Sequence, residues 1–142
     1  MAALLGVLVG ALVAATAQLW VRRSQTRERW LGELLQRCAE IYALESASRG
    51  HAFDVRQGAD RPAAAWDPVP RRQAEAAVFL LTTDAALTES VEALGRAGRA
   101  MNRAARDGVE TVVFEGLATA HAEALDAFAT AARGALRGRR VL

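Results

Sequence analysis

The chain has 142 residues, of which 52% are hydrophobic and 6% aromatic, and its formal net charge is +2 at pH 7. So small a net charge gives no support for a nucleic-acid-binding protein, and a single cysteine, Cys38, excludes an internal disulfide and a multi-cysteine metal site. With only three prolines, few aromatic residues and a wealth of helix formers, the composition favours an all-α fold.

The chain begins with an apolar stretch. Residues 2–21 contain no charged residue and are followed at once by Arg22 and Arg23. At about 1.5 Å per residue, a helix of this length spans roughly the 30 Å of a bilayer's hydrocarbon core. We therefore predict a transmembrane anchor over residues 1–22. Because basic residues tend to stay in the cytoplasm, we expect the N-terminus outside the inner (plasma) membrane and residues 23–142 in the cytoplasm.

The alternative interpretation of this stretch is a secretory signal peptide. Ala15-Thr16-Ala17, before Gln18, has the small-x-small form of a cleavage site, and cleavage there would release a secreted helical protein. A signal peptide carries its basic residues before the apolar run, however, and here they come after it. The order of charges therefore favours an uncleaved anchor.

Small residues recur every four positions along the predicted span and end in a polar group: Ala2, Gly6, Gly10, Ala14 and Gln18. The Gly6-x-x-x-Gly10 spacing lets two helix backbones approach closely in lipid. We expect this ridge to mediate association, either in a homo-oligomer or with a partner membrane protein. A membrane-active effector that permeabilises the bilayer would use the same ridge, although Thr16 and Gln18 are few polar groups for a water-filled pore.

The anchor helix is predicted to continue past Leu31 without a break, because neither Pro nor Gly interrupts Gln18 to Leu31. Its apolar face comprises Leu31, Leu34, Leu35, Cys38, Ile41, Tyr42 and Leu44 or Glu45. Arg49-Gly50 predicts an end near Ser48. Residues 49–70 hold all three prolines and are predicted to be a long loop. Its aromatic and apolar residues, Phe53, Val55 and Trp66, suggest that parts of it fold back on the bundle.

Three further helices follow in the sequence. The first covers 71–81, with Ala74, Ala77, Val78 and Leu81 on one side. Thr82-Thr83-Asp84 then offers N-cap side chains for a second helix, which ends at Asp107-Gly108 and has an a/d seam of Leu87, Val91, Leu94, Gly98, Met101 and Ala105. The third, from Val109 to about Arg137, carries a stripe of Val113, Leu117, His121, Leu125, Phe128 and Ala132.

An uncharged N-terminal span, an Arg-rich helix, a loop, a helix break at Leu80 to Ala85 and two Ala/Arg-rich helices occur in this order. This pattern resembles a broad group of small membrane-tethered helical proteins of actinobacteria. The resemblance covers most of the chain. It implies no activity, because the group has no assigned chemistry and no signature residues.

The residues that could carry chemistry do not form a recognisable motif. His121 lies on an apolar stripe, which is typical of a hydrogen-bonded core histidine, and no Glu precedes it by three positions as in helical metal sites. The loop residues His51, Asp54, Asp60 and Asp67 are irregularly spaced and match no calcium loop. Without a nucleophile beside a base, we expect no enzyme, no cofactor or metal site and no small-molecule substrate.

Arginines gather at two places after the anchor. Arg96, Arg99, Arg103 and Arg106 form a basic stripe along one helix, and Arg133, Arg137, Arg139 and Arg140 form a C-terminal cluster. A solvated face is the usual explanation of such residues. If the helices alternate in direction, the C-terminal cluster would return to the membrane surface with Arg22 and Arg23; if the two middle helices continue in one direction, it would be free for an acidic partner.

The sequence therefore predicts a single N-terminal transmembrane helix that runs into a cytoplasmic antiparallel bundle of three to four helices. We expect a non-enzymatic scaffold or accessory protein that acts through protein-protein contacts and contacts the lipid bilayer, but not nucleic acid.

Overall fold

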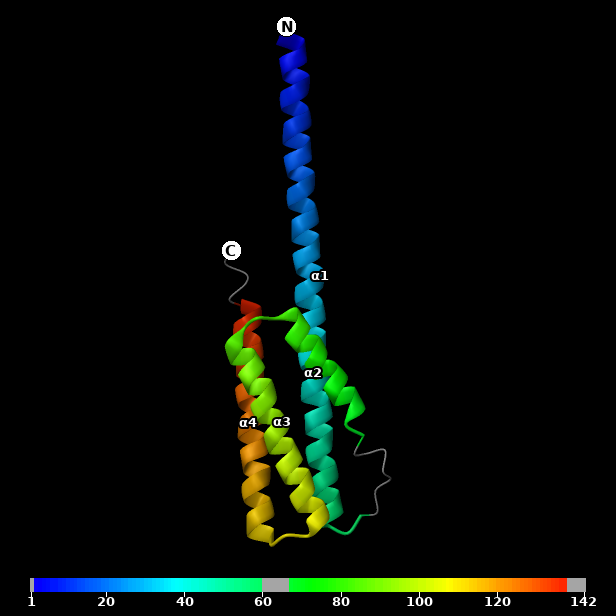
Figure 1. The fold of residues 1–142 in the computed structure, drawn as a ribbon, viewed down its shortest axis with the longest axis vertical. Coiled ribbons are helices and arrows are strands. Elements are labelled where there is room, and N and C mark those ends of the chain that lie inside the picture. The colour runs from blue at the N-terminus through cyan, green and yellow to red at the C-terminus, as the bar shows by residue number, and fades with distance from the viewer. Residues whose placement is uncertain (1, 60–66, 138–142) are drawn as a thin grey trace. The chain divides into compact units, whose positions relative to one another are not determined.

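The computed structural model describes the backbone of residues 2–59 and 67–137, and the side chains of Gln18 and of residues 21–59 and 67–137. Four helices make up this part of the chain: α1 (Ala2–Arg56), α2 (Val69–Leu81), α3 (Ala85–Asp107) and α4 (Thr111–Arg137) (Figure 1). The chain divides into two compact units, Met1–Glu33 and Leu34–Leu142, and each is described by itself.

The first unit consists of the N-terminal part of α1. The helix is unbroken between Gln18 and Leu31, as predicted, and Arg22, Arg23 and Gln18 are exposed. The ridge residues Ala2, Gly6, Gly10 and Ala14 lie outside the described side chains, as does most of the predicted span. Among the residues that the structure describes, no helix is both long and apolar enough to cross a membrane.

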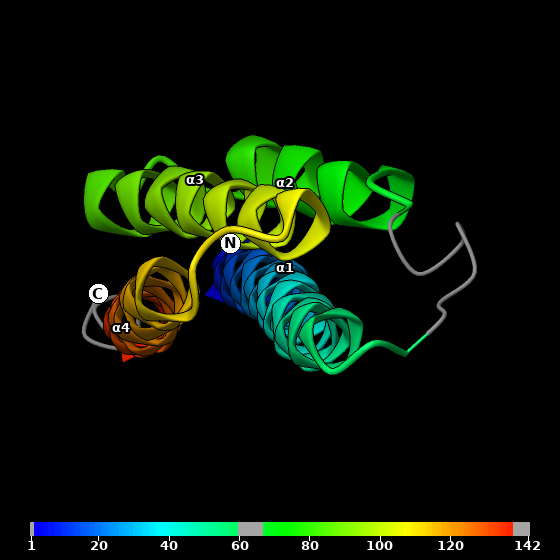
Figure 2. The ribbon, with the colours of Figure 1, turned by 90° about the horizontal axis from the view of Figure 1, so that it is seen from below.

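The second unit is a packed bundle of four helices, which confirms the all-α fold. Seen along the bundle, α2 and α3 lie on one side and α1 and α4 on the other (Figure 2). The chain reverses direction between α2 and α3 at residues 82–84, so consecutive helices alternate in direction (Figure 1). The C-terminal end of α4 therefore lies at the same end of the bundle as Leu34, which is the first of the two arrangements considered from the sequence.

The predicted end of the first helix near Ser48 is wrong, because α1 continues for two more turns to Arg56. The predicted loop over 49–70 is correspondingly too long. A glycine inside a helix costs about 1 kcal/mol relative to alanine, and packing outweighs that cost at Gly50. Ala52 is fully buried, and Phe53 meets Phe114 edge to face with 5.1 Å between ring centroids. The chain leaves the helix at Gly58, whose φ is +83°.

Phe53 and Val55 do pack against the bundle, as their apolar character predicted. They lie, partly buried, against a cluster at the end of the bundle opposite Leu34. Trp66, the third residue of that prediction, lies outside the described residues. The buried members of this cluster come from α1, α3 and α4: Ala52, Met101, Ala104, Ala105, Phe114 and Ala118.

The sequence predicts α3 most accurately. All six residues of the predicted a/d seam are buried. Asp84 caps the N-terminus, since its carboxylate accepts a hydrogen bond from the Leu87 N–H at 3.0 Å. Gly108 ends the helix with a φ of +64°, a conformation that glycine adopts without steric cost.

The cap gives a direct prediction. We expect Asp84→Ala to lower the free energy of unfolding by about 1 kcal/mol, because it leaves the Leu87 N–H without its acceptor. Urea unfolding followed by circular dichroism measures the change. Asp84→Asn is the matched control and should retain most of the stability, since its amide oxygen can accept the same bond. Equal losses in the two variants would contradict the capping role.

The predicted apolar stripe of α4 is correct only from His121 onward. Val113 is 47% exposed and Leu117 is partly buried, whereas Phe114 and Ala118 are buried. Steps of four residues advance about 40° beyond a full turn, so a stripe traced backward in such steps drifts off the core. Ala118 and Phe114, three and seven residues before His121, lie on the buried face.

Candidate functional site

A charged residue lies on the buried line of α1. Leu34, Cys38, Ile41 and Glu45 follow one another at steps of four, three and four and are buried, while Leu35 and Tyr42 of the predicted face are exposed. Glu45 is only 2% exposed. Because an isolated buried carboxylate is very costly, this side chain requires partners inside the bundle.

Glu45 has a partner on each of two other helices. Its Oε2 lies 2.8 Å from Nε2 of His121 on α4, which is fully buried. Its Oε1 forms an ion pair with Nε of Arg71 on α2. One carboxylate thus links α1, α2 and α4, and we call Glu45, Arg71, His121 and Glu75 the buried polar cluster.

Glu75 completes the cluster on α2. Its Oε1 accepts a hydrogen bond from Nη2 of Arg71 at 2.6 Å, one helical turn away, and both side chains are 17% exposed. Arg71 therefore lies between two carboxylates. A guanidinium group offers several N–H donors in a fixed plane, which suits it to bridging two acceptors in this way.

Helix α3 contacts the buried polar cluster through two glycines, Gly95 and Gly98, whose lack of a side chain leaves space for Glu45 and Arg71. An ideal Cβ on Gly98 of α3 would lie 2.7 Å from Oε2 of Glu45, and one on Gly95 would lie 2.5 Å from Nη2 of Arg71. Both distances are too short for a real contact. The absence of side chains at these two buried positions of α3 therefore lets the Glu45 carboxylate and the Arg71 guanidinium lie against its backbone.

His121 is buried and hydrogen-bonded, as the sequence predicted, but its partner was not foreseen. Its Nδ1 has no hydrogen-bond partner among the described residues. Among the same residues, no three His, Cys, Asp or Glu side chains come close enough to hold a metal ion. The contacts of Glu45 with His121 and Arg71 join three helices, so the cluster cross-links the bundle.

The sequence contains a signal for this cluster. Glu45 is one of two candidates for the apolar face of its helix, and His121 falls on the apolar stripe of another helix. Buried polar groups need hydrogen bonds, so a carboxylate and an imidazole on the apolar faces of two helices are candidates to bind each other. Nothing in the local sequence marks Arg71, which reaches the cluster from the first turns of α2.

The single cysteine is buried in the same face of α1. Burial raises the pKa of the Cys38 thiol to about 11 from 9.0. We therefore expect slow labelling of Cys38 by iodoacetamide at pH 8 in the folded chain and fast labelling in urea, because the thiolate is the nucleophile. The stability contributed by the neutral thiol is fully present below pH 9.0 and is lost as the pH rises toward about 11. Cys38→Ser should remove the labelling, and equal rates in folded and unfolded chain would contradict the burial.

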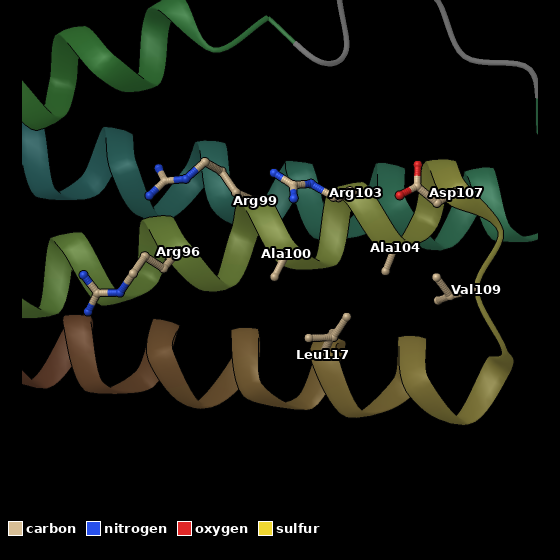
Figure 3. A pocket seen from close by; sticks show the side chains of 8 residues that line it. All are labelled: Arg96, Arg99, Ala100, Arg103, Ala104, Asp107, Val109 and Leu117. Carbon is tan, nitrogen blue, oxygen red and sulfur yellow. The ribbon is translucent and has the colours of Figure 1, made fainter.

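The basic stripe lies on the exposed surface of α3, and two hollows adjoin it. One, of about 380 Å³, has a floor of Ala100, Ala104, Val109 and Leu117 between α3 and α4 (Figure 3). Arg96 lies at one end of this hollow and Asp107 at the other (Figure 3). Arg96 also faces Glu92 one turn away, with 3.7 Å between Nη1 and Oε2.

The second hollow, of about 490 Å³, lies between α1, the start of α2 and α3, and we call it the α1–α3 pocket. Arg99 and Arg103 line both hollows. Arg71, Glu45 and Arg106 also line the α1–α3 pocket, so the buried polar cluster forms part of its wall. The structure thus brings three of the four stripe residues to one pocket.

The other predicted site residues are spread over the chain. Arg133 and Arg137 are exposed at the C-terminal end of α4, where Nη2 of Arg133 donates to Oγ1 of Thr130 at 3.2 Å. Arg139 and Arg140 lie outside the described residues, as does Asp60 of the irregular acidic set. His51 and Asp67 both line the α1–α3 pocket.

Comparison with known proteins adds no relative. No protein-family model, no curated protein and no solved structure matches this chain.

Proposed function

We propose that this chain is a single-span protein of the inner (plasma) membrane whose cytoplasmic bundle acts as a scaffold or accessory subunit through contacts with other proteins. The observation that carries the proposal is the uncharged stretch 2–21 followed by Arg22 and Arg23 on one unbroken helix. Basic residues directly after an apolar span favour retention of the following domain in the cytoplasm. Arg27 and Arg29 continue this exposed basic segment.

The direction of the helices supports contact between the bundle and the membrane surface. The chain joins the proposed anchor to the bundle at Leu34, and the C-terminal end of α4 lies at that same end of the bundle (Figure 1). Arg133 and Arg137 are exposed there. Near anionic headgroups each basic side chain contributes about 1 kcal/mol, so these arginines would add to the attraction of Arg22 and Arg23.

The buried polar cluster supports a binding role over a catalytic one. Among the described residues, the polar contacts of Glu45, Arg71 and His121 join one helix to another or one helical turn to the next. Exposed apolar side chains remain for protein contact on the bundle part of α1, where Leu35 is 54% and Tyr42 is 43% exposed two turns apart. Such residues at heptad spacing form one face of a helix.

Chemical crosslinking in native membranes tests the protein-contact part of the proposal. We expect the full chain to give a crosslinked dimer or a complex with one membrane partner, and we expect Gly6→Leu with Gly10→Leu to abolish it. Leu8→Ile with Leu12→Ile is the matched control on the opposite side of the same span. A chain that remains monomeric and captures no partner would contradict the proposal, and so would equal crosslinking of both double variants.

A further inference from the structure

We propose that the α1–α3 pocket binds a soluble organic phosphate, with the phosphate group held by Arg99 and Arg103. This goes beyond the proposed scaffold function and differs from the sequence-based expectation of no small-molecule ligand. The pocket's volume of about 490 Å³ is in the range of small-molecule sites. It is built from three helices rather than from one exposed face.

The first argument is the balance of charge around the pocket. Four arginines line it, Arg71, Arg99, Arg103 and Arg106, against two carboxylates, Glu45 and Asp67. Arg71 is paired with Glu45 and Glu75, and Arg106 has an interaction of its own, so the charge that matters here is that of Arg99 and Arg103. Both carboxylates are already engaged. Glu45 binds Arg71 and His121, and Oδ1 of Asp67 accepts the Val69 N–H at 2.9 Å.

Arg99 and Arg103 have no carboxylate partner among the described residues. Within the part of the chain that the structure describes, no carboxylate forms an ion pair with either residue, although each lies one turn from the other on α3. An ideal Cβ on Gly95 would lie 2.5 Å from Nη2 of Arg71 and 3.2 Å from both Nη1 of Arg99 and Oε1 of Glu75, so Arg99 lies near the Arg71–Glu75 pair. Arg99 and Arg103 carry like charges on successive turns of α3, and a bound anion would relieve their repulsion.

The second argument is the direction of α2. This helix begins at Val69, and its first residues, together with Pro68 and Asp67, line the pocket. The N-terminus of a helix carries a partial positive charge; Asp67 offsets part of it here by accepting the Val69 N–H, and the remainder adds to the charge of the arginines. Arginine side chains and a helix N-terminus are together a common setting for phosphate oxygens.

The apolar part of the wall indicates an organic ligand. Leu44 and Ala47 of α1, together with Pro68 and Pro70 at the start of α2, line the same pocket as the arginines. Ser48 of α1 and Asn102 of α3 also line the pocket, and Nδ2 of Asn102 donates a hydrogen bond to Oγ of Ser48 at 2.7 Å. Inorganic phosphate would leave this apolar wall uncovered, whereas a phosphate ester would bury part of it.

The pocket's place in the bundle favours a soluble ester over a phospholipid headgroup. Its α1 residues span Leu44 to His51, ten or more residues along the helix from Leu34. At about 1.5 Å per residue this is roughly 15 Å or more from the end of the bundle where the chain enters.

Calorimetric titration of the full chain in neutral detergent micelles with phenyl phosphate tests the proposal. We expect saturable 1:1 binding, tighter than that of inorganic phosphate, and a loss of about tenfold or more in Arg99→Gln with Arg103→Gln, because charge-assisted bonds to the phosphate are removed. Arg96→Gln with Arg133→Gln removes the same charge outside the pocket and should change the affinity by less than about twofold. Short-chain phosphatidic acid added to the micelles should not displace phenyl phosphate.

Three results would overturn the assignment. Absence of saturable phenyl phosphate binding would show that the pocket takes no such ligand. Equal losses in the two double variants would show only non-specific attraction to a basic surface. Displacement by phosphatidic acid would assign the site to a lipid headgroup. None of these results bears on the membrane anchor, because the crosslinking test of the scaffold function uses different residues and a different readout.

Discussion

Replacing Glu45 with alanine is expected to destabilise the bundle more than any other single change in the buried polar cluster. The substitution removes both acceptors at once and leaves Arg71 and His121 without their shared partner. Breaking a buried ion pair from one side typically costs about 3–5 kcal/mol, because the remaining charge stays desolvated. Urea unfolding of the full chain in mild detergent, followed by circular dichroism, measures the loss.

Two further variants separate the cluster from a general loss of packing. Glu92→Gln removes an exposed carboxylate from its pair with Arg96 and should cost less than about 1 kcal/mol. Replacing Glu45, Arg71 and His121 together by Leu, Met and Leu should restore much of the stability, since well-packed apolar residues can match a buried ion pair. A Glu45→Ala chain as stable as Glu92→Gln would contradict the role assigned to Glu45.

Gly98→Ala is expected to destabilise the bundle although alanine is the better helix former. Its Cβ would lie 2.7 Å from Oε2 of Glu45, so the carboxylate must move away from Nε2 of His121. We expect a net loss of about 2 kcal/mol, in which the broken buried interaction outweighs a gain of up to about 1 kcal/mol in helix propensity. The same unfolding experiment measures it.

Gly116→Ala is the matched control and is expected to act in the opposite direction. Gly116 lies on the exposed face of α4, and an added Cβ there meets nothing within 4 Å. This substitution should therefore stabilise the chain by about 0.5–1 kcal/mol through helix propensity. If Gly98→Ala also stabilises the chain, the close approach of Glu45 to α3 is wrong. In a Glu45→Gln background, the effects of Gly98→Ala should not be additive, because the two positions share one contact.

Sequence reasoning predicted those parts of the fold that local signals determine. In α3, the side-chain cap of Asp84, the heptad spacing from Leu87 and the αL conformation at Gly108 act within a few residues of one another. Each agrees with the others, so both helix ends and the buried face could be predicted. The all-α class followed in the same way from composition and periodicity.

Features that depend on distant residues were missed. Gly50 is a helix-stop signal locally, but Phe53 packs on Phe114 and Ala52 is buried, so tertiary contacts extend α1 by two turns. The buried polar cluster joins residues 76 positions apart in the case of Glu45 and His121. Its geometry became visible only once the faces of α1, α2 and α4 were placed against one another.

The basic stripe illustrates both limits. The spacing predicts that Arg96, Arg99, Arg103 and Arg106 share one side of a helix, but it does not show which other elements lie opposite them. The α1–α3 pocket also requires the second half of α1 and the first turns of α2, and the sequence-based loop over 49–70 had left part of that wall undefined. The sequence alone indicates a solvated face, whereas in the structure Arg99, Arg103 and Arg106 line the α1–α3 pocket.

Whether the chain is held in the membrane by its uncharged N-terminal stretch is tested most directly by alkaline extraction of membranes from cells that produce the full chain, followed by intact-mass measurement. The account predicts that the protein stays in the membrane pellet and retains residues 1–17 before Gln18. Recovery in the alkaline supernatant, or a mature chain that begins at Gln18, would contradict it.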